Sequence, residues 1–314
     1  MTEKSKSITI FVVLIIVIVG STFGIGMLVM NIITKEPSIP PNTHLFIDSK
    51  NRKVYVPDDP QRIISLAPSI TEAIFALGAG DRLVGRTSYC NYPQEVSTIA
   101  EVGSYSSPEL EIIASLDPDL IIATEWNAES VAQLENQGYA IVIILANTLE
   151  EIIESMGVIG NLVNNWRNSI YLMYNMLFQM ETLTNKTATL NSSQIIDCYF
   201  EIWETPKVVG AKSFIHDMIS KAGAINIFGN LDFEYPTVSH EAVINGDPDV
   251  IFITEHSAPW YEQNVCDRTG YNVVNACINN RVYLCFDDIY LRPGPRIIDA
   301  LINMTRYLYP MLFI

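Results

Sequence analysis

Short apolar runs and longer amphipathic segments alternate along most of this chain. Three apolar runs predict buried strands, at residues 62–66, 120–123 and 140–145. Three segments with helical apolar spacing predict helices, at residues 71–77, 108–116 and 129–137. A polar lead-in at residues 44–60 predicts a short hairpin before them. This alternation predicts a mostly parallel sheet covered by helices.

From Thr148 the pattern changes to one apolar stripe. Apolar residues follow one another at spacings of three and four from Leu149 to Met180, which predicts a single helix of about nine turns that begins at a Thr148–Glu151 capping box. Trp166 lies inside the stripe and is assigned to the core. A coiled-coil dimer is the alternative, but strand and helix patterns resume afterwards, which favours one helix packed across two lobes. The later elements are strands at residues 195–202, 250–253 and 282–286, and helices at residues 214–222 and 295–309.

A repeat at a constant offset of 130 residues relates two parts of the chain. Residues 115–125 (SLDPDLIIATE) match residues 245–255 (NGDPDVIFITE), and each segment is typical of a helix end, a proline turn and a buried strand. At the same offset Glu111 falls on Glu241, each near the start of the preceding helix. A single such glutamate stabilises a first helical turn. The symmetric pair favours two equivalent lobes that each present a carboxylate.

Residues 8–33 carry no charge, and as a helix they would reach ~39 Å, enough to cross a ~30 Å hydrocarbon core. Lys4 and Lys6 precede them, which places the amino end in the cytoplasm and the remainder outside. An uncleaved anchor is favoured over a cleaved signal, because neither a clear small-x-small site nor a lipoprotein cysteine follows. The expected organisation is a stub and anchor at 1–35, a tether and lead-in at 36–60, an N-terminal lobe at 61–147, a connecting helix at 148–186 and a C-terminal lobe at 187–314. The predicted fold class is therefore two three-layer α/β lobes joined by one long helix, with a transmembrane anchor.

Charge and cysteine content narrow the classes of function. Without residues 1–35 the chain has 16 basic and 34 acidic residues, a formal charge of −18, which argues against nucleic acid as the main partner. Five cysteines show no zinc spacing. Cys266 and Cys277 could form a bridge outside the cell, or all five could be small buried thiols. The four histidines are scattered, so ordinary surface or packing roles outweigh a metal site.

No G-x-S-x-G, H-E-x-x-H or P-loop motif occurs, so neither an enzyme nor a cofactor is expected. Aromatic residues instead lie where strands end and loops begin, at Tyr89, Tyr92, Tyr105, Trp126, Trp203, Tyr235, Trp260 and Tyr290. Open α/β sheets bind ligands at these strand ends, and flat aromatic rings suit a large amphipathic ligand. For any single ring, packing is the commoner role. Asp288 and Arg292 lie in a Pro/Gly-rich loop, where they could clamp the polar edge of a ligand or pair with each other.

Five ordered motifs carry a family resemblance: RIISLAPSITEAIFALGAGDRLVGRTSYCNYP, VGSYSSPELEIIASLDPDLIIAT, KAGAINIF, YPTVSHEAV and RPGPRIIDAL. Over roughly residues 60–310 the chain resembles the extracytoplasmic substrate-binding proteins of ABC importers for cobalamin and ferric siderophores. The resemblance implies two rigid lobes, a backbone helix and a ligand held between the lobes. By position it implies cobalamin contacts at Tyr89, Tyr105, Tyr235, Asp288 and Arg292.

The resemblance also implies that Glu111 and Glu241 are lobe-tip carboxylates that meet arginine pockets on the permease. Some positions depart from the cobalamin-binding members: Tyr105 and Tyr235 replace tryptophans, Ile289 replaces an aromatic residue, and the Trp126 loop is one residue shorter. These departures bear on which ligand is bound.

The expected function is capture of a corrinoid or another large metal chelate by a membrane-tethered protein, followed by delivery to an ABC permease. A ferric siderophore or haem is the nearest alternative, although few basic cleft residues are available for it (Arg86, Arg292 and Arg296). A free metal ion or an oxyanion is a further alternative. Alternatives of other classes are an α/β metal-dependent hydrolase and an adhesion or surface-layer module.

Overall fold

The computed structural model of this chain describes residues 40–203, 206–255 and 265–313. Residues 41–314 form one compact unit. In the described part of the chain, no helix is long and apolar enough to cross a bilayer. The predicted membrane anchor at residues 8–33 lies outside the described residues.

An antiparallel hairpin precedes the first sheet, as the polar lead-in predicts. It pairs β1 (Thr43–Ile47) with β2 (Lys53–Pro57). Two hydrogen bonds of 3.1 Å join its turn to the sheet, from Ser49 N to Ile143 O and from Ile143 N to the Asp48 carboxylate. The start of the described chain is thereby fixed to the first lobe.

The first sheet is parallel, in the order β5-β4-β3-β6-β7. Its strands are β3 (Ile63–Ser65), β4 (Leu83–Arg86), β5 (Ala100–Glu101), β6 (Leu120–Ala123) and β7 (Ile141–Ile143). The helices between them are α1 (Pro68–Ala76), α2 (Leu110–Ser115) and α3 (Ala128–Asn136). The apolar patterns predict all of these except β4 and β5. We call this sheet with its helices the N-terminal lobe.

The second sheet has the parallel order β10-β8-β11-β12, with β9 added antiparallel to β8. Its strands are β8 (Asp197–Trp203), β9 (Lys207–Val208), β10 (Ile225–Asn226), β11 (Val250–Thr254) and β12 (Val282–Cys285). The helices are α6 (Phe214–Lys221), α7 (His240–Gly246), α8 (Asn275–Ile278), α9 (Asp287–Tyr290) and α10 (Ile297–Leu308). We call this group the C-terminal lobe.

The 130-residue repeat is structural as well as sequential. β3 pairs with β6 as β8 pairs with β11. Asp119 and Asp249 each accept a 3.0 Å hydrogen bond from the main-chain N–H that leads into the neighbouring strand. Asp117 and Asp247, two residues earlier, have φ angles of 44° and 40°. The same turn chemistry therefore builds the same part of both lobes.

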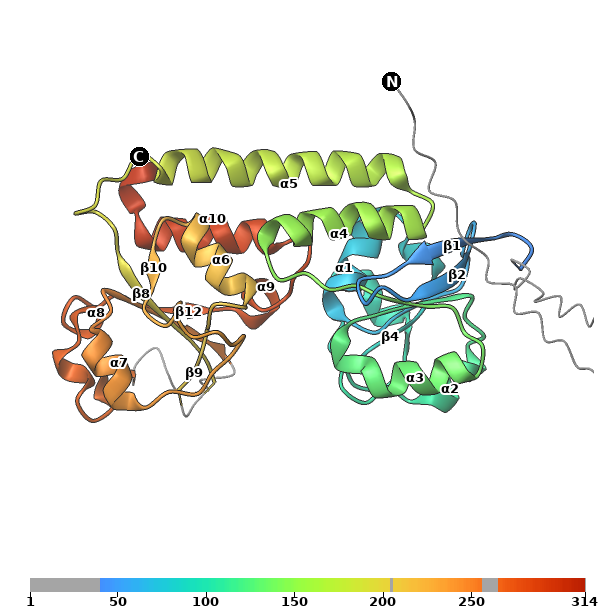
Figure 1. The fold of residues 1–314 in the computed structure, drawn as a ribbon, viewed down its shortest axis with the longest axis horizontal. Coiled ribbons are helices and arrows are strands. Elements are labelled where there is room, and N and C mark those ends of the chain that lie inside the picture. Colours follow the sequence, from blue (N-terminus) through green and yellow to red (C-terminus); the bar gives the residue numbers. More distant parts are fainter. Residues whose placement is uncertain (1–39, 204–205, 256–264, 314) are drawn as a thin grey trace, which may run out of the picture. The chain divides into compact units, whose positions relative to one another are not determined.

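Two helices connect the lobes, so the predicted single helix over residues 148–186 is wrong. α4 (Leu149–Leu162) and α5 (Trp166–Thr187) run antiparallel and pack against each other (Figure 1). The chain reverses at Asn164, whose φ of 51° is tolerated by asparagine better than by most residues. The two helices approach closely at Gly160, where a Cβ would stand 2.3 Å from the side chain of Ser169.

α5 buries a different face from the one that the apolar spacing predicts. Ser169 and Met176, which lie outside the predicted stripe, are buried beside Met180 at its end, whereas Trp166 within the stripe is 51% exposed. The assignment of Trp166 to the core is therefore wrong. The spacing of three and four continues in the sequence through residues 163–165, but the helix stops there and restarts with its buried face rotated.

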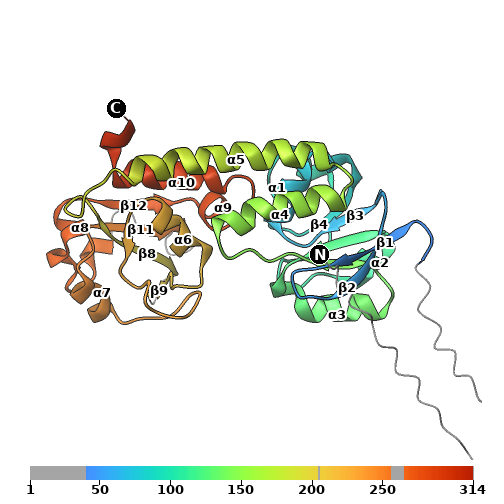
Figure 2. The same ribbon diagram turned by 45° about the horizontal axis from the view of Figure 1, so that its top comes forward.

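One apolar core runs through both lobes. It extends from Ile63 and Leu120 of the first sheet, through α1, α4, α5, α6 and α10, to Phe200 and Phe252 of the second. Smaller cores lie on the other faces of the sheets, under α2 and α3 and under α7 and α8. Each sheet is thus covered on both faces, and Figure 2 shows α4, α5 and α10 gathered on the shared side. A continuous core between the lobes stiffens their junction.

Candidate functional site

A cavity of about 480 Å³ is lined by residues of both lobes. Its walls come from segments that follow the carboxyl ends of β3, β4, β5, β6, β7 and β12, from Ile202 in β8, and from residues 214, 234 and 235 of the C-terminal lobe. Ligands of open α/β sheets bind at this edge, and the volume lies within the range of ~300–1,000 Å³ typical of small-molecule sites. The cavity is therefore the candidate binding site.

Three tyrosines line this cavity, at Tyr89, Tyr105 and Tyr235. The Tyr105 hydroxyl lies 3.1 Å from Thr124 Oγ1, and burial raises the pKa of Tyr105. Burial likewise raises the pKa of Tyr235. Tyr89 is 57% exposed. The rings thus offer both fixed and accessible aromatic surface, and the two buried hydroxyls stay protonated at neutral pH.

The cavity wall is acidic. Among the described lining residues four carboxylates stand against one guanidinium, that of Arg292; the carboxylates are Glu125, Glu234, Asp287 and Asp288. Burial raises the pKa of Glu234, and the negative charge of Glu125 raises it further. A hydrogen bond with Tyr235 lowers this pKa but does not cancel the rise. Lys50 forms an ion pair with Glu125. The wall therefore suits a neutral or cationic ligand better than a polyanion.

Asp288 and Arg292 pair with each other, the second of the two roles that the sequence left open. Arg292 Nη1 also donates to Glu72 Oε1 at 2.9 Å and to Asn91 Oδ1 at 2.8 Å. Asn91 Nδ2 donates in turn to Asp288 Oδ2 at 2.6 Å. Arg296 completes the group with hydrogen bonds of 2.8 and 2.6 Å to the Glu72 carboxylate. This network joins the lobes at the edge of the cavity.

Glu72 was not anticipated from the sequence, although a signal was present. It is a single carboxylate inside the apolar helix α1, and its side chain is only 1% exposed. A buried carboxylate requires a paired cation. Two arginines in the Pro/Gly-rich loop were available for that role.

Three other candidate aromatic residues, Tyr92, Trp203 and Tyr290, are not part of the described cavity lining. Tyr290 is 2% exposed, and its ring packs 6.3 Å from that of Phe200. Trp203 is 51% exposed at the end of β8 and is not part of the described lining. The side chain of Trp126 and all of Trp260 lie outside the described part of the chain. Tyr92 packs against Arg296, with 4.2 Å from the guanidinium to the ring centre.

Glu111 and Glu241 are exposed and occupy the second position of α2 and of α7. The Glu241 carboxylate accepts hydrogen bonds from its own backbone N–H and from the Ser239 side chain, and these bonds lower the pKa of Glu241. Both helices cover the face of their sheet that lies opposite the shared core. The two carboxylates thus lie at equivalent places in the two lobes; their contact with a permease stays a prediction.

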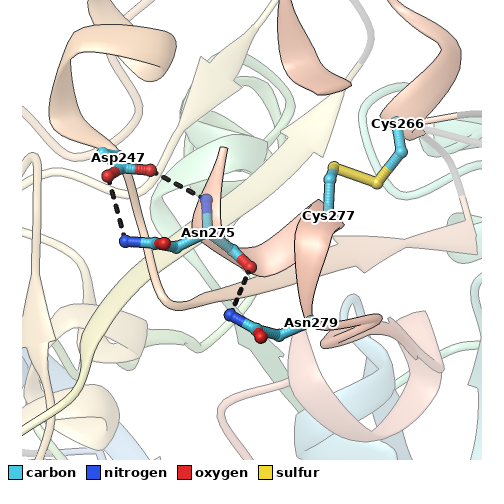
Figure 3. The surroundings of a disulfide bond; sticks show 5 residues. All are labelled: Asp247, Cys266, Asn275, Cys277 and Asn279. Atoms are coloured by element: carbon cyan, nitrogen blue, oxygen red, sulfur yellow. Dashed lines mark hydrogen bonds between the residues drawn. A yellow bond between two sulfur atoms is a disulfide. The ribbon is translucent and has the colours of Figure 1, made fainter. Parts of the chain in front are cut away.

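Cys266 and Cys277 form a disulfide (Figure 3), whereas Cys90, Cys198 and Cys285 are buried thiols. The bridged segment holds α7 at both ends. Asn275 N and Nδ2 donate to the Asp247 carboxylate at 2.8 and 3.0 Å. At the other end, the Tyr271 hydroxyl lies 3.1 Å from His240 Nδ1.

The described histidines have ordinary polar partners. His44 pairs with Asp58, His216 with Asn226 and His240 with Tyr271. His256 lies outside the described part of the chain. Within the residues that the structure describes, no three His, Cys, Asp or Glu side chains lie together as a metal site requires.

The family model of a periplasmic binding protein matches residues 63–288. The chain is 28% identical to the uncharacterized ABC transporter substrate-binding lipoprotein YvrC of Bacillus subtilis, over 85% of each chain. It is 30% identical to the vitamin B12-binding protein of Vibrio cholerae over 79% of this chain and 89% of that protein. The crystal structure of the periplasmic vitamin B12-binding protein of Vibrio cholerae superposes with a TM-score of 0.71, covering 80% of this chain and 97% of that one at 29% identity.

A periplasmic heme-binding protein of Roseiflexus has the same fold. It superposes with a TM-score of 0.72 at 24% identity, over 80% of this chain and 99% of that one.

Proposed function

This chain belongs to the periplasmic binding protein family, and on that premise we propose that it captures cobalamin or a related corrinoid outside the cytoplasm and delivers it to the permease of an ABC importer. The family consists of substrate-binding transport proteins rather than enzymes. The mechanism is binding and release, with no bond made or broken in the ligand.

The observation that carries the proposal is a cavity between two lobes, walled by three tyrosines and four carboxylates. A corrinoid presents a flat apolar ring with neutral amide side chains. Tyr105 and Tyr235 supply ring contacts from opposite lobes, and the carboxylates and tyrosine hydroxyls accept hydrogen bonds from the amides. Arg292 and Asp288 are already held in the interlobe network, so they shape the rim and orient only the outer edge of the ligand.

Charge favours a corrinoid over the alternatives. Haem carries two carboxylates, and ferric complexes of catecholate and carboxylate siderophores are anionic, so the acidic wall repels both kinds of ligand. One observation supports haem as a second candidate, because a tyrosine oxygen can ligate ferric iron. The raised pKa values of Tyr105 and Tyr235 oppose this, since iron binds the deprotonated oxygen.

In the proposed arrangement residues 8–33 anchor the protein in the membrane, with Lys4 and Lys6 on the cytoplasmic side. Glu111 and Glu241 dock the lobes on basic pockets of the permease. Two observations support this docking role: α2 and α7 are equivalent within the structural repeat, and both carboxylates are exposed. Charge pairs of this kind steer encounter more than they tighten it.

The test is to purify the full chain in detergent, add cyanocobalamin, haemin or a ferric siderophore in separate samples, and separate bound from free ligand by gel filtration. We expect cobalamin absorbance to travel with the protein at one ligand per chain. Co-migration of haemin alone would establish the second candidate. If none of the chelates travels with the protein, the proposed function is wrong.

A further inference from the structure

Six large apolar side chains are exposed on α5 between Trp166 and Phe178. Their exposed fractions range from 39% for Leu177 to 71% for Tyr171. At 3.6 residues per turn they fall within an arc of roughly 140° on one side of the helix. We call them the α5 stripe: Trp166, Ile170, Tyr171, Tyr174, Leu177 and Phe178.

The α5 stripe is not the face that holds α5 in the fold. The helix packs on α4 and α10 through another face, which buries Ser169, Met176 and Met180. Within the stripe, the rings of Tyr174 and Phe178 stack at 6.3 Å. Soluble monomers rarely expose a contiguous apolar surface of this kind unless it contacts a partner.

Charge around the stripe differs from charge on the rest of the body. Residues 166–178 contain no carboxylate and one basic residue, Arg167, whose guanidinium lies 5.4 Å from the ring centre of Trp166. The part of the chain outside residues 1–35 carries a formal charge of −18. The stripe is therefore an apolar band that contains one basic residue and is followed by the exposed Glu181 on an otherwise acidic protein. A band with so little charge suits a phospholipid headgroup region better than another acidic surface.

The tether brings a membrane within reach of this band. Only nine residues, 34–42, separate the uncharged segment from β1, so the fold begins at most ~30 Å from the membrane surface. The β1–β2 hairpin is bonded to the N-terminal lobe through Ser49. The start of α5 is bonded to the same lobe, since Asn165 and Asn168 donate to Leu77 O at 2.6 and 2.9 Å.

We propose that the α5 stripe lies on the outer surface of the membrane that carries the anchor. This step rests on the anchor in the proposed function. Tryptophan and tyrosine favour the lipid–water interface, where the ring is buried and the polar atom stays hydrated. A helix with one apolar aromatic face binds in the plane of that interface.

Lipid contact and permease docking use different faces. α5 lies on the shared-core side of the first sheet, whereas α2 with Glu111 lies on the other side. The two faces cannot meet the same membrane at once. The lipid-bound orientation is therefore a resting state that docking must end.

The test uses the full chain reconstituted into phosphatidylcholine vesicles, with and without bromine on the acyl chains. Bromine quenches a tryptophan that reaches the lipid. Because the chain has four tryptophans, the emission of Trp166 is taken as the difference from a Trp166→Phe variant. We expect brominated lipid to remove most of this emission.

A variant with Tyr171→Ser, Tyr174→Ser and Phe178→Ser should still float with the vesicles but lose the quenching. A matched variant with Ile225→Ser and Ile278→Ser, which are 54% and 59% exposed in the C-terminal lobe, should keep it. If the unmodified chain floats with the vesicles but its Trp166 is not quenched, the lipid contact is overturned and the anchor is not. If that chain then crosslinks into dimers, the α5 stripe is assigned to contact with a second copy of the chain. Absence of flotation overturns both the anchor and the lipid contact, while cobalamin binding is judged separately in detergent.

Discussion

Arg292 donates a 2.9 Å hydrogen bond from Nη1 to Glu72 Oε1, although 220 residues separate them in the sequence. The bond joins the loop after α9 in the C-terminal lobe to α1 in the N-terminal lobe. Glu72 also accepts from Arg296, so one nearly buried carboxylate compensates two guanidinium groups. The junction of the lobes therefore combines an apolar core with a charged pair at the rim of the cavity.

Glu72→Ala should destabilise the folded protein strongly. Removing the carboxylate leaves Arg292 and Arg296, which are 12% and 20% exposed, without their shared anion. Breaking a buried pair in this way costs about 3–5 kcal/mol in the free energy of unfolding. Urea unfolding of the full chain measures this, and Glu101→Ala, which removes a 52% exposed partner of Arg86, should cost at most ~1 kcal/mol. Equal losses in the two variants would contradict the role of Glu72.

Tyr105→Ser and Tyr235→Ser should each weaken cobalamin binding, because each removes a ring from the cavity wall. Loss of about 1.5–3 kcal/mol of ring burial corresponds to a ~10- to 150-fold rise in Kd. Equilibrium titration followed by absorbance measures the change. Tyr290→Phe is the matched control, since that ring lies in the core and the Kd should not change. An unchanged Kd in both serine variants would remove the tyrosines from the site.

Much of the fold was predictable because its signals are local. The β6 and β11 strands follow matching DPD turns, and the φ angles of Asp117 and Asp247 show why the two turns share a sequence. The apolar spacing does not indicate the break between α4 and α5, because it continues from Val163 to Trp166. The break lies at the two polar residues between them, Asn164 and Asn165. β4 was missed because it is short and contains Gly85, where any Cβ would crowd Ile64 and Val102.

The site was predictable only in part, for a different reason. Strand ends identify where a cavity forms, which places Tyr105 and Tyr235 correctly on its wall. Which way a loop side chain points depends on the turn that carries it, and the short helix α9 directs Tyr290 into the core. The pairing of Glu72 with Arg292 depends on how two distant segments meet, so no local pattern encodes it.

Glu111→Ala combined with Glu241→Ala should leave the Kd for cobalamin unchanged and abolish uptake through the permease. Both carboxylates are exposed on helices that lie away from the cavity lining. Glu111→Ala alone and Glu241→Ala alone should each reduce uptake in part. This loss of uptake should grow as the salt concentration is raised, since exposed charge pairs are screened over about 8 Å at physiological ionic strength. Vesicle uptake of labelled cobalamin measures this effect. Glu154→Ala with Glu181→Ala makes the same charge change on α4 and α5 and should leave uptake intact; a loss of ligand affinity in the first variant would contradict the docking role.

Replacing Cys266 and Cys277 by serine should loosen α7 more than the equivalent helix α2. The bridged segment fixes α7 through Asn275 at one end and Tyr271 at the other. Loss of the disulfide should lower the free energy of unfolding by about 2–4 kcal/mol. Hydrogen exchange should speed up at residues 240–247 and stay unchanged at residues 110–115. Uniform acceleration across both helices would show that the bridge acts on global stability alone.

Glu234→Gln should raise the Tm at pH 7 and lose this advantage in acid. Burial raises the pKa of Glu234 above its ordinary value of 4.5, so folding favours the protonated carboxyl. The stability that this carboxyl contributes is fully present below its unfolded pKa and is lost as the pH rises through the folded pKa. Glutamine mimics the protonated form and removes that loss. Calorimetric scans between pH 4 and pH 8 measure the difference in Tm, and Asp232→Asn, an 82% exposed charge in the same loop, serves as the control. A difference that is constant over this range would contradict any shift in the pKa of Glu234 on folding, and a lower Tm for Glu234→Gln at pH 7 would contradict a raised pKa.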